Sequence, residues 1–320
     1  MSILKHKDYF AAIDMGTNSF HLIIVKIEAD GSFKIVDRER IVIRLGSNSK
    51  DDFQKISLEE EEHALEILSG FKKLASEYDA QIRAVATSAV REAKNNKKFI
   101  ETIFDKTGIA VEIIEGKHEA NLIFQGAKKA LNLSDKKVLC VDIGGGSTEI
   151  ILGQNNKIIF AESIKIGAVR MTKKFFPDFV LTDSAINKCQ DFVEEQISSN
   201  KNILFDNDFE IGVGTSGTIQ SAASMILNRI SDGKNKSLNG YSFNKAQLKY
   251  ITYEILNAKS VHERQKIKFI DKKRADILPA GLIILNKVFE LFNMEQITIS
   301  EYALREGVIL EMIDKEKNQL

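Results

Sequence analysis

The most informative stretch of the sequence is Val138-Leu-Cys-Val-Asp-Ile-Gly-Gly-Gly-Ser-Thr-Glu-Ile-Ile-Leu152. Two short apolar runs flank a tight polar turn, a pattern typical of a β-hairpin. Successive glycines let another group approach the backbone closely, and their N–H groups can converge on an anion. The hydroxyls that follow add hydrogen-bond donors. The stretch therefore predicts a phosphate-binding nest formed by Gly144, Gly145, Gly146, Ser147 and Thr148.

Two carboxylates flank this turn, Asp142 before it and Glu149 after it. Carboxylate oxygens beside a bound phosphate suit a hard cation, so the pair is a candidate site for Mg²⁺. Glycine clusters are also common in turns that bind nothing, and a glycine-rich hairpin without a ligand is the alternative interpretation.

A second copy of the pattern lies near the N-terminus, in Asp14-Met-Gly-Thr-Asn-Ser-Phe-His-Leu-Ile-Ile24. When the two stretches are aligned, an aspartate, a glycine, a serine and the apolar strand that follows coincide. Because the copies are about one domain apart, the repeat predicts two similar α/β halves with a phosphate chain held in a cleft between them. Taken alone, the first copy could be a plain polar turn. Its candidate phosphate-binding residues are Asp14, Gly16, Thr17, Asn18 and Ser19.

Length and composition predict a cytoplasmic protein with one large domain or two ordinary ones. The chain has 320 residues, and its 43% hydrophobic content suffices for a sizeable core. Zero formal net charge argues against a general nucleic-acid binder. The two cysteines indicate neither a disulfide framework nor a cysteine metal site. No apolar run is long enough for a leader peptide or a membrane span, so no membrane partner is expected.

Glu119 and Arg91 are two further candidates for chemistry. Glu119 lies in the first turn of a predicted helix over 117–132, where it can act as a general base for water attacking phosphorus. Stabilisation of the helix dipole explains the same residue equally well. Arg91 follows a predicted strand over 81–86, and a guanidinium is a natural bidentate partner for phosphate. A surface ion pair with Glu92 is the alternative.

The remaining predictions concern secondary structure and polar clusters. Separate strands are expected at 33–36 and 41–45, and helices at 181–204 and 261–269. The glycine-rich turn over 212–218 has neither P-loop nor Rossmann spacing, so a plain tight turn is the better interpretation. Three polar clusters near helix starts are candidate ion pairs between the halves: Arg170, Arg274 with Asp276, and Arg305 with Glu306.

Eight motifs follow one another along nearly the whole chain. They are Asp14-Met-Gly-Thr-Asn-Ser-Phe-His21, Ala86-Thr-Ser-Ala-Val-Arg-Glu-Ala93, Gly116-Lys-His-Glu-Ala120, Asp142-Ile-Gly-Gly-Gly-Ser-Thr-Glu149, Ile166-Gly-Ala-Val-Arg-Met-Thr172, Gly214-Thr-Ser-Gly-Thr218, Arg274-Ala-Asp-Ile-Leu-Pro-Ala-Gly281 and Ser300-Glu-Tyr-Ala-Leu-Arg-Glu-Gly307. Together they resemble the exopolyphosphatase / guanosine pentaphosphate phosphohydrolase (Ppx/GppA) family in its short two-domain form.

The resemblance implies an α/β fold of duplicated ribonuclease-H-like (actin-like ATPase) domains that face an interdomain cleft. Domain I would comprise 1–126 plus 304–320, with the terminal helix packed on it, and domain II would comprise 127–303. The family's catalytic glutamate corresponds to Glu119, its metal-linked acids to Asp142 and Glu149, and its arginine to Arg91. Its phosphate loops correspond to residues 14–19 and 144–148. The chain departs from the family motif at Glu115 and His118, where serine and glutamate are usual.

The resemblance also implies an activity. The expected reaction is Mg²⁺-dependent release of terminal phosphate from inorganic polyphosphate, with a monovalent cation such as K⁺ as a further candidate and a homodimer as the expected state. Hydrolysis of pppGpp to ppGpp, a reaction of the stringent response, is the first alternative. A non-hydrolytic phosphate or nucleotide sensor and a sugar kinase are alternatives of other classes. The retained Glu119 and acid pair argue against the sensor, and the lack of a recognisable adenosine site argues against the kinase.

Overall fold

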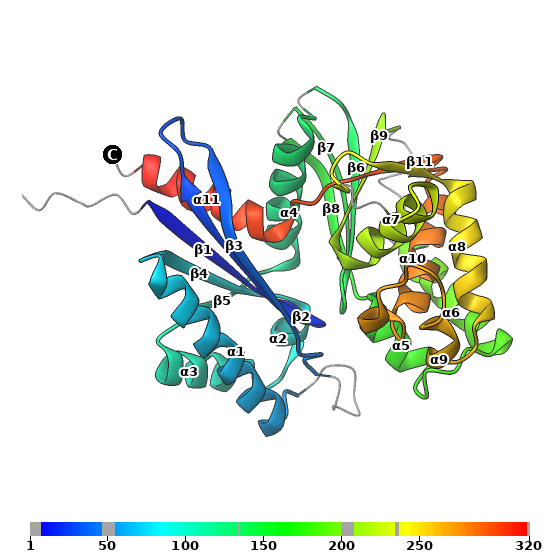
Figure 1. The fold of residues 1–320 in the computed structure, drawn as a ribbon, viewed down its shortest axis with the longest axis horizontal. Helices are drawn as coiled ribbons and strands as arrows, with labels where there is room; N and C mark the ends of the chain where they lie inside the picture. Colours follow the sequence, from blue (N-terminus) through cyan, green and yellow to red (C-terminus); the bar gives the residue numbers. More distant parts are fainter. Residues whose placement is uncertain are drawn as a thin grey trace, which may run out of the picture. The chain divides into compact units, whose positions relative to one another are not determined.

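The computed structural model describes residues 8–46, 55–133, 135–155, 157–199, 208–233 and 237–318. The chain divides into two compact units, Met1–Leu122 with Leu304–Leu320, and Ile123–Ala303. The sequence-based boundary lies after residue 126, whereas the chain passes from the first unit to the second within a helix, after Leu122. Each unit is built around its own sheet (Figure 1).

Unit 1 contains a five-stranded sheet in the order β3-β2-β1-β4-β5. The first three strands pair antiparallel, and β4 and β5 run parallel to β1. The strands are β1 (Tyr9–Met15), β2 (Ser19–Ile27), β3 (Phe33–Val42), β4 (Gln81–Ala86) and β5 (Val111–Ile113).

The prediction of two strands at 33–36 and 41–45 was wrong, because β3 is continuous. Its pairing with β2 shifts register between Ile24 and Val25, so that Asp37 pairs with Ile24 and Ile35 with Val25. This β-bulge accommodates one extra residue, so β3 continues without interruption through the charged segment in its middle.

The helices of unit 1 are α1 (Leu58–Glu77), α2 (Ser88–Glu92), α3 (Asn96–Thr107), α11 (Leu304–Lys317) and the first part of α4 (Gly116–Leu131). Ser57 and Glu60 form a capping box at the start of α1, which satisfies two backbone donors reciprocally. The terminal helix α11 packs on β1 and β2 (Figure 1), as the resemblance implied.

Unit 2 contains a six-stranded sheet in the order β10-β11-β9-β6-β7-β8. The strands are β6 (Val138–Ile143), β7 (Thr148–Gln154), β8 (Lys157–Ile164), β9 (Ile211–Thr215), β10 (Ser242–Asn244) and β11 (Gln296–Ile299). Strands β6, β7 and β8 pair antiparallel, while β9 runs parallel to β6 and β11 parallel to β9. Apart from the added β10, this is the strand order of unit 1.

The two glycine-containing hairpins share the same register as well as the same place in their sheets. Asp14 lies directly opposite His21 in the β1–β2 pair, and Asp142 lies directly opposite Glu149 in the β6–β7 pair. The shared strand order and register confirm the predicted duplication of a ribonuclease-H-like α/β fold.

The helices of unit 2 are α5 (Ala168–Phe175), α6 (Asp183–Ser198), α7 (Ser216–Ile230), α8 (Lys245–Asn257), α9 (Val261–Arg264), α10 (Leu278–Leu291) and the second part of α4. Helix α6 begins later than predicted because Thr182 caps it, and it ends at Ser198; residues 200–204 of the predicted helix lie outside the described residues. The helix predicted at 261–269 was too long, since α9 is one turn. Helix α10 is apolar nearly all round and forms the centre of the unit 2 core.

Arg264 at the end of α9 is the largest fully buried side chain among the described residues. Its guanidinium donates to the carbonyl oxygens of Ala275 at 2.6 Å, Phe179 at 2.8 Å, Ala258 at 3.0 Å and Lys259 at 3.2 Å. Burial lowers the pKa of this guanidinium, an effect that the nearby acids partly offset. One side chain thus satisfies the carbonyl groups of three separate segments.

We expect Arg264→Met to lower the free energy of unfolding by about 3 kcal/mol, because buried carbonyl oxygens lose their donors. Urea denaturation followed by circular dichroism measures this. The matched control is Arg38→Met on β3, where the arginine is exposed, and its expected effect is within about 0.5 kcal/mol. Equal effects of the two substitutions would contradict the structural role of Arg264.

None of the helices in the described part of the chain combines the length and the apolar character needed to cross a membrane.

Candidate functional site

The carboxylates of Asp142 and Glu149 are both buried at the carboxyl end of β6. They are 7% and 1% exposed and face one another across the β6–β7 pair. The Thr215 hydroxyl donates to Asp142 Oδ2 at 2.5 Å, and the Ser163 hydroxyl donates to Glu149 Oε1 at 2.7 Å. Carboxylate oxygens are the ligands that hard cations prefer, so this facing pair is a candidate cation site.

The turn between these carboxylates presents its N–H groups away from α5. Backbone N–H groups of Ala168 and Val169 donate to the carbonyl oxygens of Gly144 and Gly145, each at 2.9 Å. Arg170 Nε donates to the Gly146 carbonyl oxygen at 2.7 Å. Because a trans peptide holds its C=O and the next N–H on opposite sides, the N–H groups of residues 145–147 point away from α5. This is the arrangement of an anion-binding nest.

The nest is held by close backbone packing. A Cβ on Gly167 would overlap the Gly145 carbonyl oxygen, so only glycine lets α5 begin this near the turn. The Thr148 hydroxyl, predicted as a phosphate donor, donates to the Ile166 carbonyl oxygen at 2.5 Å and so stabilises the turn itself. Arg170 also stabilises the turn, through its hydrogen bond to the Gly146 carbonyl oxygen within unit 2.

The glycine-rich turn over 212–218 lies beside Asp142, although its sequence predicted only a plain tight turn. Strand β9 pairs with β6 so that Thr215 lies beside Asp142. Ser216 adopts a left-handed backbone conformation (φ 67°) and donates through its hydroxyl to the Ile143 carbonyl oxygen at 2.6 Å. A Cβ on Gly217 would overlap the Arg274 guanidinium. This turn follows an apolar strand and repeats the Ala86–Ser88 turn of the first half. That repetition is the signal in the sequence that could have identified it.

In unit 1, the turn over 14–19 buries polar groups. Thr17, Asn18 and Ser19 are 3%, 7% and 4% exposed. The Asn18 carbonyl oxygen accepts from the N–H groups of Ile43 and Arg44, each at 3.0 Å. Its side-chain Nδ2 and Oδ1 are both buried and have no hydrogen-bond partner among the described residues. An unsatisfied buried polar group costs about 1–3 kcal/mol, so the Asn18 amide is a candidate contact for a bound ligand.

Arg91 and Glu119 form an ion pair at the same edge of the unit 1 sheet. Arg91 Nη1 donates to Glu119 Oε2 at 2.9 Å and to the Ile114 carbonyl oxygen at 2.7 Å. The Glu119 side chain is only 8% exposed, and Arg91 is 17% exposed. Because Thr87 N–H donates to the Met15 carbonyl oxygen, the start of α2 lies beside the end of β1. Arg91, which was predicted to bind phosphate, thus holds the carboxylate of Glu119, which was predicted to act as the general base.

His118 contacts the terminal helix. Its Nε2 lies 3.2 Å from Glu311 Oε1, and Glu311 also pairs with Arg83. Burial alone would raise the pKa of the Glu311 carboxyl, but the hydrogen bond and charge of Arg83, together with the charges of Lys315 and His118, lower that pKa below its ordinary value. His118 therefore ties α4 to α11.

Arg305 Nη2 lies 3.9 Å from Glu306 Oε1, the partner that the sequence suggested. Arg274 was predicted to act with Asp276, and its Nε lies 3.8 Å from Asp271 Oδ2. The members of each pair belong to the same unit.

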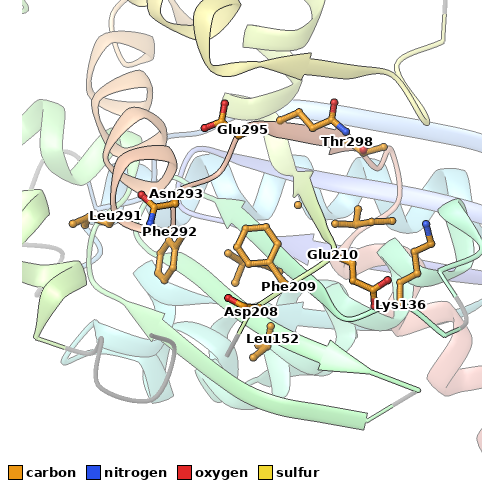
Figure 2. Close-up of a pocket in the computed structure, with 14 residues that line it drawn as sticks. Lys136, Leu152, Asp208, Phe209, Glu210, Leu291, Phe292, Asn293, Glu295 and Thr298 are labelled. Atoms are coloured by element: carbon orange, nitrogen blue, oxygen red, sulfur yellow. The ribbon is translucent and has the colours of Figure 1, made fainter. Parts of the chain in front are cut away.

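A cavity of about 660 Å³ lies at the opposite end of the unit 2 sheet, near the starts of β6, β9 and β11. Figure 2 shows the rings of Phe209 and Phe292 in its lining, with the carboxylates of Asp208, Glu210 and Glu295 and the ammonium group of Lys136 around them. No candidate site residue lines this cavity.

The donor set of the Asp142–Glu149 pair fits Mg²⁺. Within the described ranges, no group of three or more His, Cys, Asp or Glu side chains is placed to share a metal ion. Magnesium is commonly bound through one or two carboxylates, with waters and substrate phosphates completing its shell. Two buried carboxylates beside an anion nest meet that requirement.

Comparisons with known proteins identify relatives of this chain. A curated relative from Photobacterium profundum, named guanosine-5′-triphosphate,3′-diphosphate pyrophosphatase, is 34% identical over 313 residues, which cover 96% of this chain and 59% of the relative. A relative of the same name from Vibrio parahaemolyticus is 30% identical and covers 98% and 61%. The chain thus spans about three fifths of the length of the curated relatives it matches.

Solved structures match over nearly the full length of both chains. A crystal structure described as an exopolyphosphatase from Cytophaga hutchinsonii has a TM-score of 0.88 and 29% identity, covering 96% of this chain and 98% of that one. A Ppx/GppA family member from Aquifex aeolicus has a TM-score of 0.79 and 28% identity, with the same coverages. The sequence profile of the Ppx/GppA phosphatase family matches residues 23–316. The chain therefore belongs to the Ppx/GppA phosphatase family.

Proposed function

We propose that this chain hydrolyses a terminal phosphoanhydride bond, and that its substrate is pppGpp, which it converts to ppGpp and orthophosphate. The observation that carries the proposal is the buried Glu119 carboxylate, which Arg91 holds at the sheet edge that also bears the unsatisfied Asn18 amide. The names of the curated relatives support the choice of pppGpp.

In the proposed reaction, Glu119 orients a water molecule and accepts its proton. The water oxygen forms a bond to the terminal phosphorus while the bond from phosphorus to the bridging oxygen breaks, so orthophosphate leaves and the bridging oxygen stays on the shortened product. Arg91 positions Glu119 and can stabilise charge on the phosphoryl oxygens. Within unit 1, the Asn18 amide would donate a hydrogen bond to a phosphoryl oxygen. Within unit 2, the backbone N–H groups of residues 145–147 would form the phosphate nest.

Asp142 and Glu149 would hold Mg²⁺ in this proposal. A bound Mg²⁺ supplies neutralisation of the charge on the phosphate groups. The hydroxyls of Thr215 and Ser163 donate to the two carboxylates and would hold them in place for a cation. A monovalent cation such as K⁺ is a further candidate, and the homodimer and the cytoplasmic location remain predictions.

Inorganic polyphosphate is the second candidate substrate. It is favoured by the likeness to the Cytophaga hutchinsonii structure, which is described as an exopolyphosphatase and covers nearly all of this chain. Both substrates end in a phosphoanhydride, so the same nest and base would serve either.

Phosphate release from purified protein tests the proposal. Substrates are pppGpp, short-chain and long-chain polyphosphate and ATP, each with and without Mg²⁺ and K⁺. We expect Mg²⁺-dependent release from pppGpp, with ppGpp identified by anion-exchange chromatography, and a loss of Mg²⁺ response in Asp142→Asn. Faster release from polyphosphate would favour the second candidate. Binding of these ligands without any release would contradict hydrolysis and support the sensor.

A further inference from the structure

His21 occupies in unit 1 the position that Glu149 occupies in unit 2. It lies opposite Asp14 on β1 and opposite Arg40 on β3, so these three side chains share one row on one face of the sheet. Helix α11 packs on the same strands and brings Arg305 to His21. The repeat therefore carries an imidazole where its other copy carries a carboxylate.

The two ring nitrogens of His21 contact different partners. Nε2 lies 2.8 Å from the Ser19 hydroxyl oxygen, and Nδ1 lies 3.3 Å from Arg305 Nη1. A guanidinium has only donors, so the contact with Arg305 suits an unprotonated Nδ1 that accepts a hydrogen bond. In that tautomer the neutral ring carries its proton on Nε2 and donates it to the Ser19 oxygen. These two contacts therefore favour the tautomer with the proton on Nε2.

We propose that His21 is a positioning residue that keeps the Ser19 hydroxyl available as a donor to a phosphoryl oxygen. Ser19 accepts from Nε2, so its single hydroxyl hydrogen stays directed elsewhere. With the opposite tautomer, Nε2 would accept that hydrogen and turn Ser19 away from a ligand. The inference rests on the proposed function for the identity of the ligand, since Ser19 belongs to the predicted phosphate turn.

The charged groups around His21 come from three elements. Asp14 lies opposite His21 on β1, and Arg40 lies opposite His21 on β3. Arg305 and its neighbour Glu306 lie on α11. Glu306 is buried and lies 3.9 Å from the Arg305 guanidinium, which helps hold that group toward His21. The contact between His21 and Arg305 joins residues 284 positions apart.

Nitrogen-15 NMR of protein labelled at its five histidines tests the tautomer without any assay of activity. The His21 signals, assigned by their loss in His21→Asn, should show a protonated Nε2 and an unprotonated Nδ1 at neutral pH. The substitution Arg305→Met should lower the fraction of rings that carry the proton on Nε2. A protonated Nδ1 in the unaltered protein would overturn the proposal whatever the chain hydrolyses.

Kinetics on pppGpp test the consequence for Ser19. The side-chain amide of Gln can reach the position of Nε2 and donate there, whereas Asn is too short. We expect His21→Asn to raise KM about tenfold with a smaller change in kcat, and His21→Gln to stay within about threefold of the parent. In a Ser19→Ala background, His21→Asn should have no further effect on KM.

Independent effects of His21→Asn and Ser19→Ala, or equal effects of Asn and Gln, would contradict the positioning role, provided that thermal melting shows all variants folded. Failure of the unaltered protein to release phosphate from any substrate would instead contradict the proposed function, and the NMR result would still decide the tautomer.

Discussion

Glu119→Gln should fold normally and lose most of its turnover, with kcat for phosphate release falling about 10²–10⁴-fold. The amide is nearly the same size as the carboxylate and can still accept a hydrogen bond from Arg91, so the local structure should survive. What it lacks is a basic oxygen to take the proton of water. The measurement is steady-state phosphate release, with thermal melting to verify folding.

Glu115→Gln is the matched control, because it makes the same chemical change one turn earlier at an exposed position. Its kcat should stay within about twofold of the parent, since surface substitutions of this kind disturb little. Near-normal turnover in Glu119→Gln would remove Glu119 from the role of general base. Equal losses in both variants would indicate a general effect of charge on the helix start.

Gly307→Ala is expected to destabilise unit 1 severely. A Cβ on Gly307 of α11 would overlap the Leu122 carbonyl oxygen of α4. The obstructing atom belongs to a helix backbone, which cannot rotate away as a side chain can. We expect a loss of about 3 kcal/mol in the free energy of unfolding, at the upper end of what overpacking usually costs. Urea denaturation of the two proteins side by side measures it.

The control is Gly70→Ala on α1, which is exposed and has nothing within 4 Å of an added Cβ. Here the same substitution should stabilise by about 0.5–1 kcal/mol, because alanine loses less conformational entropy in a helix. The two substitutions are expected to change the free energy of unfolding in opposite directions, so the comparison distinguishes them clearly. A Gly307→Ala protein as stable as the parent would mean that α4 and α11 can separate without penalty.

Sequence reasoning worked best where the information is local. The two hairpins were visible as glycines between apolar runs, and the helix predicted over 117–132 matches α4 (Gly116–Leu131) within one residue at each end. It failed at β3, because a bulge depends on the pairing with β2 and leaves no mark within the strand. It overextended the helix after Ser260, since the end of α9 is set by the contacts of Arg264 with distant segments.

The site contacts that the sequence could not supply join distant positions. The order of residues does not reveal that Arg91 pairs with Glu119, that Thr215 donates to Asp142, or that Arg305 reaches His21. Each of these contacts depends on which strands and helices are neighbours in the fold. Once the strand order is known, the turns at the carboxyl ends of parallel strands meet, and the weak motif over 212–218 becomes part of the site.

The matching registers of the two hairpins bear on the number of divalent cations that one chain binds. A duplicated fold could hold a cation in each half, yet only one of these two hairpins sets two acids opposite one another. The Asp142–Glu149 row carries two formal negative charges, whereas the Asp14–His21 row carries one and continues into Arg40 on β3, with Arg305 of α11 against His21. Under the proposed function, the symmetric scaffold is therefore expected to bind one divalent cation per chain. Because Glu149 of one repeat corresponds to His21 of the other, we expect only the repeat with Glu149 to bind the cation.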